Sequence, residues 1–108
     1  MYYHTTDNRP SIEISPGVHA RSFWGDTLTL VIVDLEPNSS VPTHSHPHEQ
    51  AGMVLKGEIE FTIADETKML YPGDIYMIPG GIEHKVIVGA EPVQVLDVFT
   101  PVREKLKY

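Results

Sequence analysis

The segment at residues 58–63 reads Glu-Ile-Glu-Phe-Thr-Ile, and its polar and apolar residues alternate throughout. The side chains of a β-strand point alternately to the two faces of its sheet. Ile59, Phe61 and Ile63 therefore share one face, and the three polar residues share the other. The segment predicts a strand with one buried face and one face in contact with solvent.

The same period recurs on both sides of this segment, with turn-forming residues about every eight to twelve positions. No stretch has the period of an amphipathic helix of convincing length. The chain therefore predicts an all-β sandwich or barrel, with one domain over residues 1–108. Residues 103–108 fit either a short helical turn or a tail. The other strand candidates are Ser11–Ser15, Val18–Trp24, Thr27–Leu35, Gln50–Lys56, Lys68–Tyr71, Asp74–Ile78, His84–Val88 and Val93–Phe99.

The composition excludes several classes of function. The 108 residues include 15 acidic and 8 basic ones, for a net charge of −7, and such a surface repels nucleic acids. The absence of cysteine excludes disulfides, zinc-thiolate sites and thiol catalysis. The polar N-terminus does not resemble a signal peptide, and no apolar run is long enough for a membrane span. We expect a cytoplasmic protein with no membrane partner, and because a small domain has a small core, we expect a homodimer.

Three histidines lie within residues 44–48, in the sequence His-Ser-His-Pro-His. On an extended segment His44 and His46 project to the same face, and Pro47 favours extended geometry for His46. Two imidazoles on one face can share a metal ion such as zinc, nickel, iron or copper. Taken alone, such a cluster is more often a solvated histidine-rich loop.

The surroundings of the cluster favour the metal site. The spacing His44-x-His46-x3-Gln50-x6-Gly57 is followed by Pro72-Gly73-x5-Pro79-x-Gly81-x2-His84, and the two blocks, at residues 38–57 and 72–88, resemble the two motifs of the cupin superfamily. The resemblance implies a jelly-roll barrel (a double-stranded β-helix) with one divalent metal ion near its centre. The implied metal ligands are His44, His46, Gln50 and His84.

The chain departs from the cupin motifs at three positions. Asn38 replaces the leading glycine, which is tolerable because asparagine also adopts left-handed backbone conformations. Val88 replaces a closing asparagine outside the metal set. Gln50 stands where many cupins have glutamate, so the ligand set carries no charge, and this favours Lewis-acid chemistry over a need for redox chemistry. The metal can be zinc, nickel, manganese, iron or cobalt.

The remaining polar residues near the cluster have lesser expected roles. On a regular strand Glu49 points away from Gln50, so we expect it at the surface. His48 is expected behind the metal ligands or at the rim of the site. His4 and His19 have no partner in the sequence, and we expect them to be surface residues or hydrogen-bonded core residues.

The segment Val93–Phe99 places an acid, Asp97, on the same face as three apolar residues. A carboxyl on such a face is costly unless it has a partner or a use. One interpretation is a structural Asp97 hydrogen-bonded to neighbouring backbone or to Arg103. The other is a general acid or base facing the metal cavity, with Phe99 as an apolar wall and Arg103 as a fork for a carboxylate.

The residues 96–104, Leu-Asp-Val-Phe-Thr-Pro-Val-Arg-Glu, together with the His44–Gln50 block, resemble the KdgF-type cupins of pectin degradation. That resemblance implies conversion of 4,5-unsaturated monouronates, from pectin or alginate, to linear 5-keto-4-deoxyuronate by ring opening. It also implies catalytic or substrate-contacting roles for Asp97, Phe99 and Arg103, in a C-terminal segment at residues 93–103. The partner is then a small anionic sugar. The alternatives are a cupin with polyketide cyclase-like or dioxygenase activity, and a cupin that binds sugar without turnover.

Overall fold

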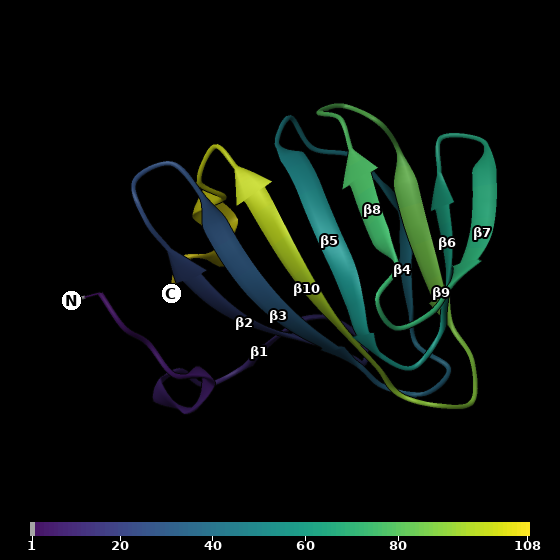
Figure 1. Ribbon diagram of the computed structural model, residues 1–108, viewed down its shortest axis with the longest axis horizontal. Coiled ribbons are helices and arrows are strands. Elements are labelled where there is room, and N and C mark those ends of the chain that lie inside the picture. Colours follow the sequence, from purple (N-terminus) through teal and green to yellow (C-terminus); the bar gives the residue numbers. More distant parts are fainter. Residues whose placement is uncertain (1) are drawn as a thin grey trace.

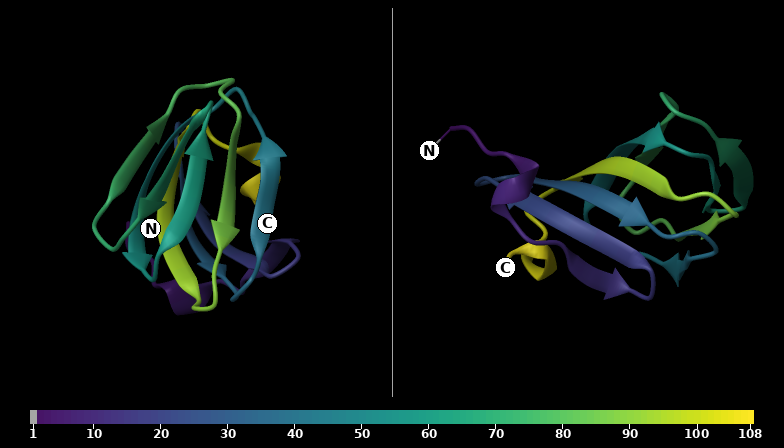
Figure 2. Two further views of the ribbon diagram at one scale, coloured as in Figure 1. Left: turned by 90° about the vertical axis from the view of Figure 1, so that its right-hand side faces the viewer. Right: turned by 90° about the horizontal axis from the view of Figure 1, so that it is seen from below.

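The computed structural model describes residues 2–108 and contains two antiparallel β-sheets that face each other (Figures 1 and 2). The larger sheet has the strand order β1-β2-β3-β10-β5-β8, and the smaller has the order β4-β9-β6-β7. In Figure 1 the smaller sheet lies at the right, and β1 to β3 extend to the left. This arrangement confirms the all-β prediction and the jelly-roll class.

Nine of the ten strands lie close to predicted segments, and two 3₁₀ turns lie near the ends of the chain. The C-terminal residues, which the sequence left undecided, form one of these turns. The elements are η1 (Thr6–Asn8), β1 (Ile12–Ser15), β2 (Val18–Trp24), β3 (Thr29–Leu35), β4 (Ser40–His44), β5 (Glu49–Lys56), β6 (Ile59–Ile63), β7 (Glu66–Leu70), β8 (Ile75–Ile78), β9 (His84–Val88), β10 (Val93–Thr100) and η2 (Glu104–Leu106).

Strand β4 was absent from the predicted strands. It contains Pro42 and has no buried residue, so it lacks the alternation that marks a half-buried strand. Its pairing with β9 also shifts in register between Val41 and His44. The prediction for β7 began two residues late, because this edge strand is exposed except at Leu70.

The core lies between the sheets and follows the alternation of the strands. In β3 and β10 every second residue is buried, from Thr29 to Leu35 and from Val93 to Phe99. Asp97 is therefore one of the inward-facing residues, as its position in the alternation predicted. Leu106 of η2 is buried against the same core.

The opposite side of the larger sheet carries an outer apolar face, eight residues from β3, β10, β5 and β8. Their pairing is continuous, since Leu96 lies between Ile32 and Met53, and Val98 lies between Leu30 and Ala51. At the edge strand, Ile75 and Met77 are 62% and 61% exposed. The eight residues are Leu30, Ile32, Ala51, Met53, Ile75, Met77, Leu96 and Val98. Within residues 2–108, no helix has the length and apolar character to cross a membrane.

Candidate metal centre

Three histidines from different segments meet at one end of the space between the sheets. His44 is the last residue of β4, His84 is the first residue of β9, and the two are paired in the smaller sheet. His46 lies in the connection between β4 and β5, so loop geometry and not strand alternation brings it to the others. One donor nitrogen of each ring lies within 4.8 Å of the other two. This spacing is compatible with a shared metal ion.

The backbone fixes which nitrogen each ring presents. The Nδ1 atoms of His44, His46 and His84 lie 2.9, 3.1 and 2.9 Å from the carbonyl oxygens of Pro42, His48 and Ile82. A neutral imidazole has one N–H, and donating it from Nδ1 leaves a lone pair on Nε2. Each ring therefore turns its Nε2 lone pair away from its own loop, as a metal ligand requires.

The protonation equilibria of the two more buried rings agree with this tautomer. Burial is the main cause that lowers the pKa of His84 to about 4, and His44, His46 and Arg103 act in the same direction. Burial also lowers the pKa of His46, and Arg103 acts in the same direction. Both rings are therefore neutral near pH 7. The Nε2 atom of His84 is buried and has no hydrogen-bond partner among residues 2–108, which is unusual for a polar atom in a protein core.

Gln50 of β5 completes the set. Its side chain is buried, and its Oε1 lies 3.0 Å from Nε2 of His46. Because Nδ1 of His46 donates to a carbonyl, this contact places an amide oxygen beside a nitrogen lone pair, unless the ring is doubly protonated. A cation between the two atoms would satisfy both of them. The donor set therefore fits a divalent metal ion, and the orphaned His84 Nε2 fits it as well.

The turn that follows β8 holds the histidine loop in place. The amide of Gly81 donates to the carbonyl of His46 at 2.8 Å. A Cβ atom at Gly80 would lie 2.3 Å from the carbonyl oxygen of Pro47, so only glycine lets the two loops pack this closely. Gly81 itself has a φ of +81°. The glycines of the second motif thus position a ligand of the first.

Asp97 lies in the cavity that His44, Gln50 and His84 also line. Its carboxyl is buried, and Oδ1 accepts a hydrogen bond of 2.5 Å from the hydroxyl of Tyr76. Burial raises the pKa of Asp97 to about 6, against the opposing effects of Tyr76, Gln50 and Arg103. Gln50, whose Oε1 contacts His46, lowers the pKa of Asp97, so this side chain lies between the carboxyl and the histidine cluster.

Phe99 and Arg103 line the same cavity. The ring of Phe99 lies edge to face with His46, with centroids 5.5 Å apart. The guanidinium carbon of Arg103 lies 4.8 Å from the centroid of Phe99, and its backbone amide donates to Thr29 Oγ1 at 2.9 Å. The C-terminal segment is thereby folded back over the cavity.

Arg103 forms no ion pair with Asp97. Among residues 2–108, no carboxylate oxygen lies within 4.0 Å of its guanidinium nitrogens, although the residue is half-buried. The structural interpretation named Arg103 or backbone as the hydrogen-bond partner of Asp97, and neither is the partner that the structure shows. The partner is Tyr76, which the sequence analysis did not select. Gly52, a glycine inside a strand, was the available signal of a close approach at this point.

The other polar residues near the cluster fall close to their expected places. Glu49 is exposed, and His48 is half-buried beside Phe99, with ring centroids 6.5 Å apart. His48 contributes the carbonyl that orients His46, so it supports the site from its backbone. His4 is exposed and contacts Phe23.

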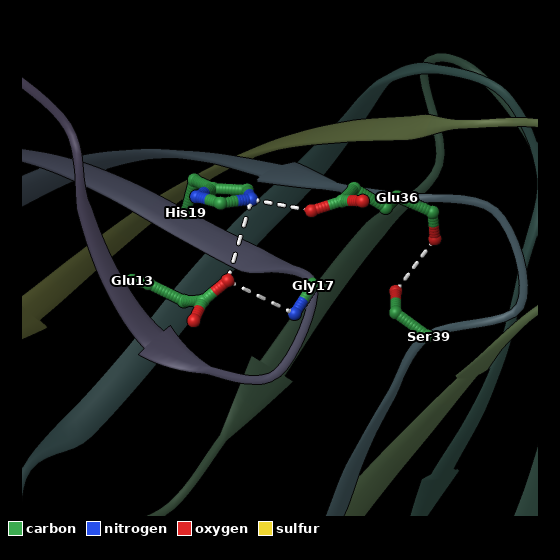
Figure 3. Close-up of polar contacts among 5 residues, drawn as sticks. All are labelled: Glu13, Gly17, His19, Glu36 and Ser39. Carbon is green, nitrogen blue, oxygen red and sulfur yellow. Dashed lines mark hydrogen bonds and ion pairs between the residues drawn. The ribbon is translucent and has the colours of Figure 1, made fainter.

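His19 belongs to a second titratable cluster, on the face of β2 that points away from the core (Figure 3). Its Nε2 lies 2.6 Å from Glu36 and 3.8 Å from Glu13. The hydrogen bond with Glu36 raises the pKa of His19. The cluster ties the β1–β2 hairpin to the turn after β3, where Ser39 donates to the backbone carbonyl of Glu36. This is a surface ion-pair cluster, as the expectation of a surface histidine allows.

Comparison with known proteins decides the family. Residues 31–99 match the cupin domain. The chain belongs to the cupin family. The matched residues include the histidine cluster, Gln50, Asp97 and Phe99, so the candidate metal centre lies inside the matched domain of this cupin.

Curated relatives of the cupin include plant germin-like proteins. Germin-like protein 3-8 of rice, Oryza sativa subsp. japonica, is 35% identical over 104 residues, covering 87% of this chain and 46% of its own length. Germin-like protein subfamily 1 member 5 of Arabidopsis thaliana is 32% identical over 88 residues, covering 71% of this chain and 40% of its own length. The cupin spans less than half the length of these relatives.

Solved structures match the cupin over nearly its whole length. KdgF from Halomonas sp. superposes with a TM-score of 0.91 at 23% identity, over 99% of both chains. An RmlC-like cupin from Shewanella frigidimarina gives 0.92 at 20% identity, over 99% of this chain and 96% of the other. The polyketide cyclase RemF from Streptomyces resistomycificus gives 0.81 at 25% identity, over 93% and 79%. The first two likenesses establish the fold, and the neighbours of this cupin include enzymes.

Proposed function

We propose that this cupin opens the ring of 4,5-unsaturated monouronates to give linear 5-keto-4-deoxyuronate, with one divalent metal ion held by His44, His46, Gln50 and His84. The observation that carries the proposal is the half-buried guanidinium of Arg103, which has no acidic partner among the described residues and lies at the cavity of the histidine cluster. In a chain of net charge −7, a free guanidinium beside a cavity is suited to an anionic ligand.

The proposed reaction needs no cosubstrate. The substrate is a cyclic enol ether with a carboxylate, and the linear keto acid is its isomer. The ring C–O bond at the anomeric carbon breaks, the anomeric hydroxyl loses its proton to become an aldehyde, and the released enolate takes up a proton at C4 to become the ketone. The net change is one proton moved from oxygen to carbon, so the protein needs a group that accepts and returns a proton.

The residues of the cavity divide these tasks. Asp97 is the one carboxyl among the residues that line it, so we assign it the proton transfer. Arg103 orients the substrate carboxylate through its fork of N–H donors. Phe99 forms an apolar wall against which the guanidinium packs. When bound, the divalent metal supplies Lewis-acid polarisation of a substrate oxygen.

The comparisons support this assignment at the level of fold and motif. The superposition with KdgF extends over both chains almost completely, and Asp97, Phe99 and Arg103 of the KdgF-type segment line the cavity. A second candidate is a polyketide cyclase-like reaction, which the 25% identity to RemF favours.

The test is to incubate metal-loaded protein with a 4,5-unsaturated galacturonate or its alginate-derived counterpart and to follow the loss of alkene absorbance. We expect turnover that chelation abolishes and a divalent metal restores. Arg103→Lys keeps the charge and loses the fork, so KM should rise more than kcat falls. Binding without alkene loss would contradict the enzymatic proposal and leave a sugar-binding cupin.

The metal assignment has its own test. His46→Ala should lower metal content severely, as measured by elemental analysis of the purified protein. The matched control is His4→Ala, which replaces an exposed histidine outside the cluster. One metal ion per chain retained in a His44→Ala, His84→Ala double variant would overturn the assignment.

A further inference from the structure

A glycine occupies the middle of β5 between two polar residues of the neighbouring strands. Gly52 is paired with Asp97 of β10 on one side and with Tyr76 of β8 on the other. It lies on the buried face of β5, between the inward-facing Gln50 and Val54. Glycine inside a strand weakens it, because it has no side chain to pack and loses more entropy on folding. Its presence here therefore calls for a local reason.

The space above Gly52 is filled by its two neighbours. A Cβ atom at this position would lie 2.2 Å from the ring of Tyr76 and 2.4 Å from Oδ1 of Asp97. The tyrosine ring thus extends across β5, over the glycine, and its hydroxyl donates to Oδ1 of Asp97 at 2.5 Å. Any residue with a side chain at position 52 would block this contact.

The tyrosine is held firmly enough to fix the carboxyl. Its side chain is buried, and its ring packs on Phe61 of the smaller sheet, with centroids 4.5 Å apart. A phenol has one O–H to donate, and this one goes to Asp97. One oxygen of the carboxyl is therefore engaged, and this restricts how the group can turn.

We propose that Gly52 and Tyr76 together are positioning residues for Asp97: the tyrosine hydroxyl, crossing the strand where the side chain is missing, holds the carboxyl in the orientation needed for proton transfer. This inference deepens the proposed function and rests on it for the catalytic role of Asp97. Neither residue is required to touch the substrate.

The kinetic test is Tyr76→Phe, which removes only the hydroxyl. Losing a hydrogen bond to a charged, catalytically used group should lower kcat on the order of 10- to 100-fold. KM and metal content should stay within about twofold, since the Arg103 fork and the histidines are untouched. The matched control is Tyr71→Phe, which changes an exposed tyrosine and should leave both constants as in the wild type. A Tyr76→Phe protein with wild-type kcat would overturn the proposal.

Gly52→Ala tests the role of the glycine, because the methyl group of alanine must displace the ring of Tyr76. We expect a kcat at least as low as that of Tyr76→Phe, with metal retained. If this variant does not fold, Tyr76→Phe still decides the proposal. An active Gly52→Ala protein with unchanged kcat would overturn the role of the glycine.

A double-variant cycle by urea unfolding separates this proposal from the proposed function. Tyr76→Phe should lower the urea midpoint of the wild type, because it leaves an oxygen of Asp97 without a donor, but not that of Asp97→Ala, in which the hydroxyl has already lost its acceptor. Equal lowering in both backgrounds would show that Tyr76 does not act through Asp97. If the wild type does not convert the unsaturated uronate, the proposed function fails, and the cycle still decides whether Tyr76 holds the carboxyl.

Discussion

Asp97→Asn separates proton transfer from every other property of the site. The amide keeps the shape of the carboxyl, and its oxygen can still accept from the hydroxyl of Tyr76, which now lies 2.5 Å from Oδ1. The amide cannot deliver a proton. A positioned acid or base contributes about 10²–10⁴-fold to a rate, so we expect kcat to fall by that factor. This corresponds to about 3–5 kcal/mol of activation free energy.

The same substitution changes the stability of the metal-free protein in a predictable direction. Burial raises the pKa of Asp97 from 3.8 to about 6, which corresponds to a free-energy penalty of about 3 kcal/mol for the ionised carboxyl in the folded state. Because the folded pKa is the higher one, the folded state binds the proton more tightly. The free energy of unfolding of the wild type therefore falls as pH rises from about 4 to about 6, and stays lower above that.

The Asp97→Asn variant has no such penalty, but Gln50 favours the ionised carboxyl at this position, and the new amide brings N–H groups in place of an acceptor oxygen. A buried donor without an acceptor costs about 1–3 kcal/mol. The two effects nearly cancel at pH 7, so we expect the two metal-free proteins to differ there by no more than about 2 kcal/mol. The decline between about pH 4 and pH 6 should be present in the wild type and weaker in Asp97→Asn.

Initial rates of alkene loss measure the fall in kcat. Urea unfolding of chelator-treated protein between about pH 4 and pH 6 measures how the free energy of unfolding depends on pH. Metal content, determined by elemental analysis, should not change. If Asp97→Asn keeps kcat within about twofold, Asp97 is not the proton-transfer group. If the two proteins lose stability in parallel as pH rises, the buried carboxyl does not cause the decline.

Three further predictions concern other parts of the molecule. Gln50→Glu places a second carboxyl beside Asp97 and adds a negative charge to the ligand set. We expect metal affinity, measured by chelator competition, to be retained or increased, and turnover to become slower. Faster turnover at every pH would contradict this prediction. Glu36 raises the pKa of His19, so the pair stabilises the folded protein below about pH 6.5, and this contribution is lost as pH rises through the higher folded pKa. Glu36→Gln should remove that pH dependence from the melting temperature. An unchanged dependence of the melting temperature on pH would refute the role of this pair. We expect the outer apolar face to pair two chains, so Ile75→Lys with Met77→Lys should convert a dimer to a monomer in light scattering, and a monomeric wild type would disprove the interface.

Local alternation in the sequence was enough to predict the strands and the direction of their side chains. Because successive side chains of a strand point to opposite faces, the pattern of residues 93–99 placed Asp97 and Phe99 on the inner face without knowledge of any neighbour. The spacing of the histidine motifs likewise selected the residues that meet in the structure. The pattern failed at β4, because an exposed strand containing a proline has no alternation to detect.

The tertiary structure alone decided which strands are neighbours, and with this it decided the partners of the polar residues. Alternation is a property of one strand and carries no information about the strand beside it. Gly52, Tyr76 and Asp97 lie far apart in the sequence, and they meet only because β5 pairs with β8 on one side and with β10 on the other. The return of the chain after β10 likewise places Arg103 over Phe99, with no carboxylate beside it in the described residues. Such contacts depend on the packing of distant segments, so the sequence could nominate the acid and the arginine but could not show that they are not paired with each other.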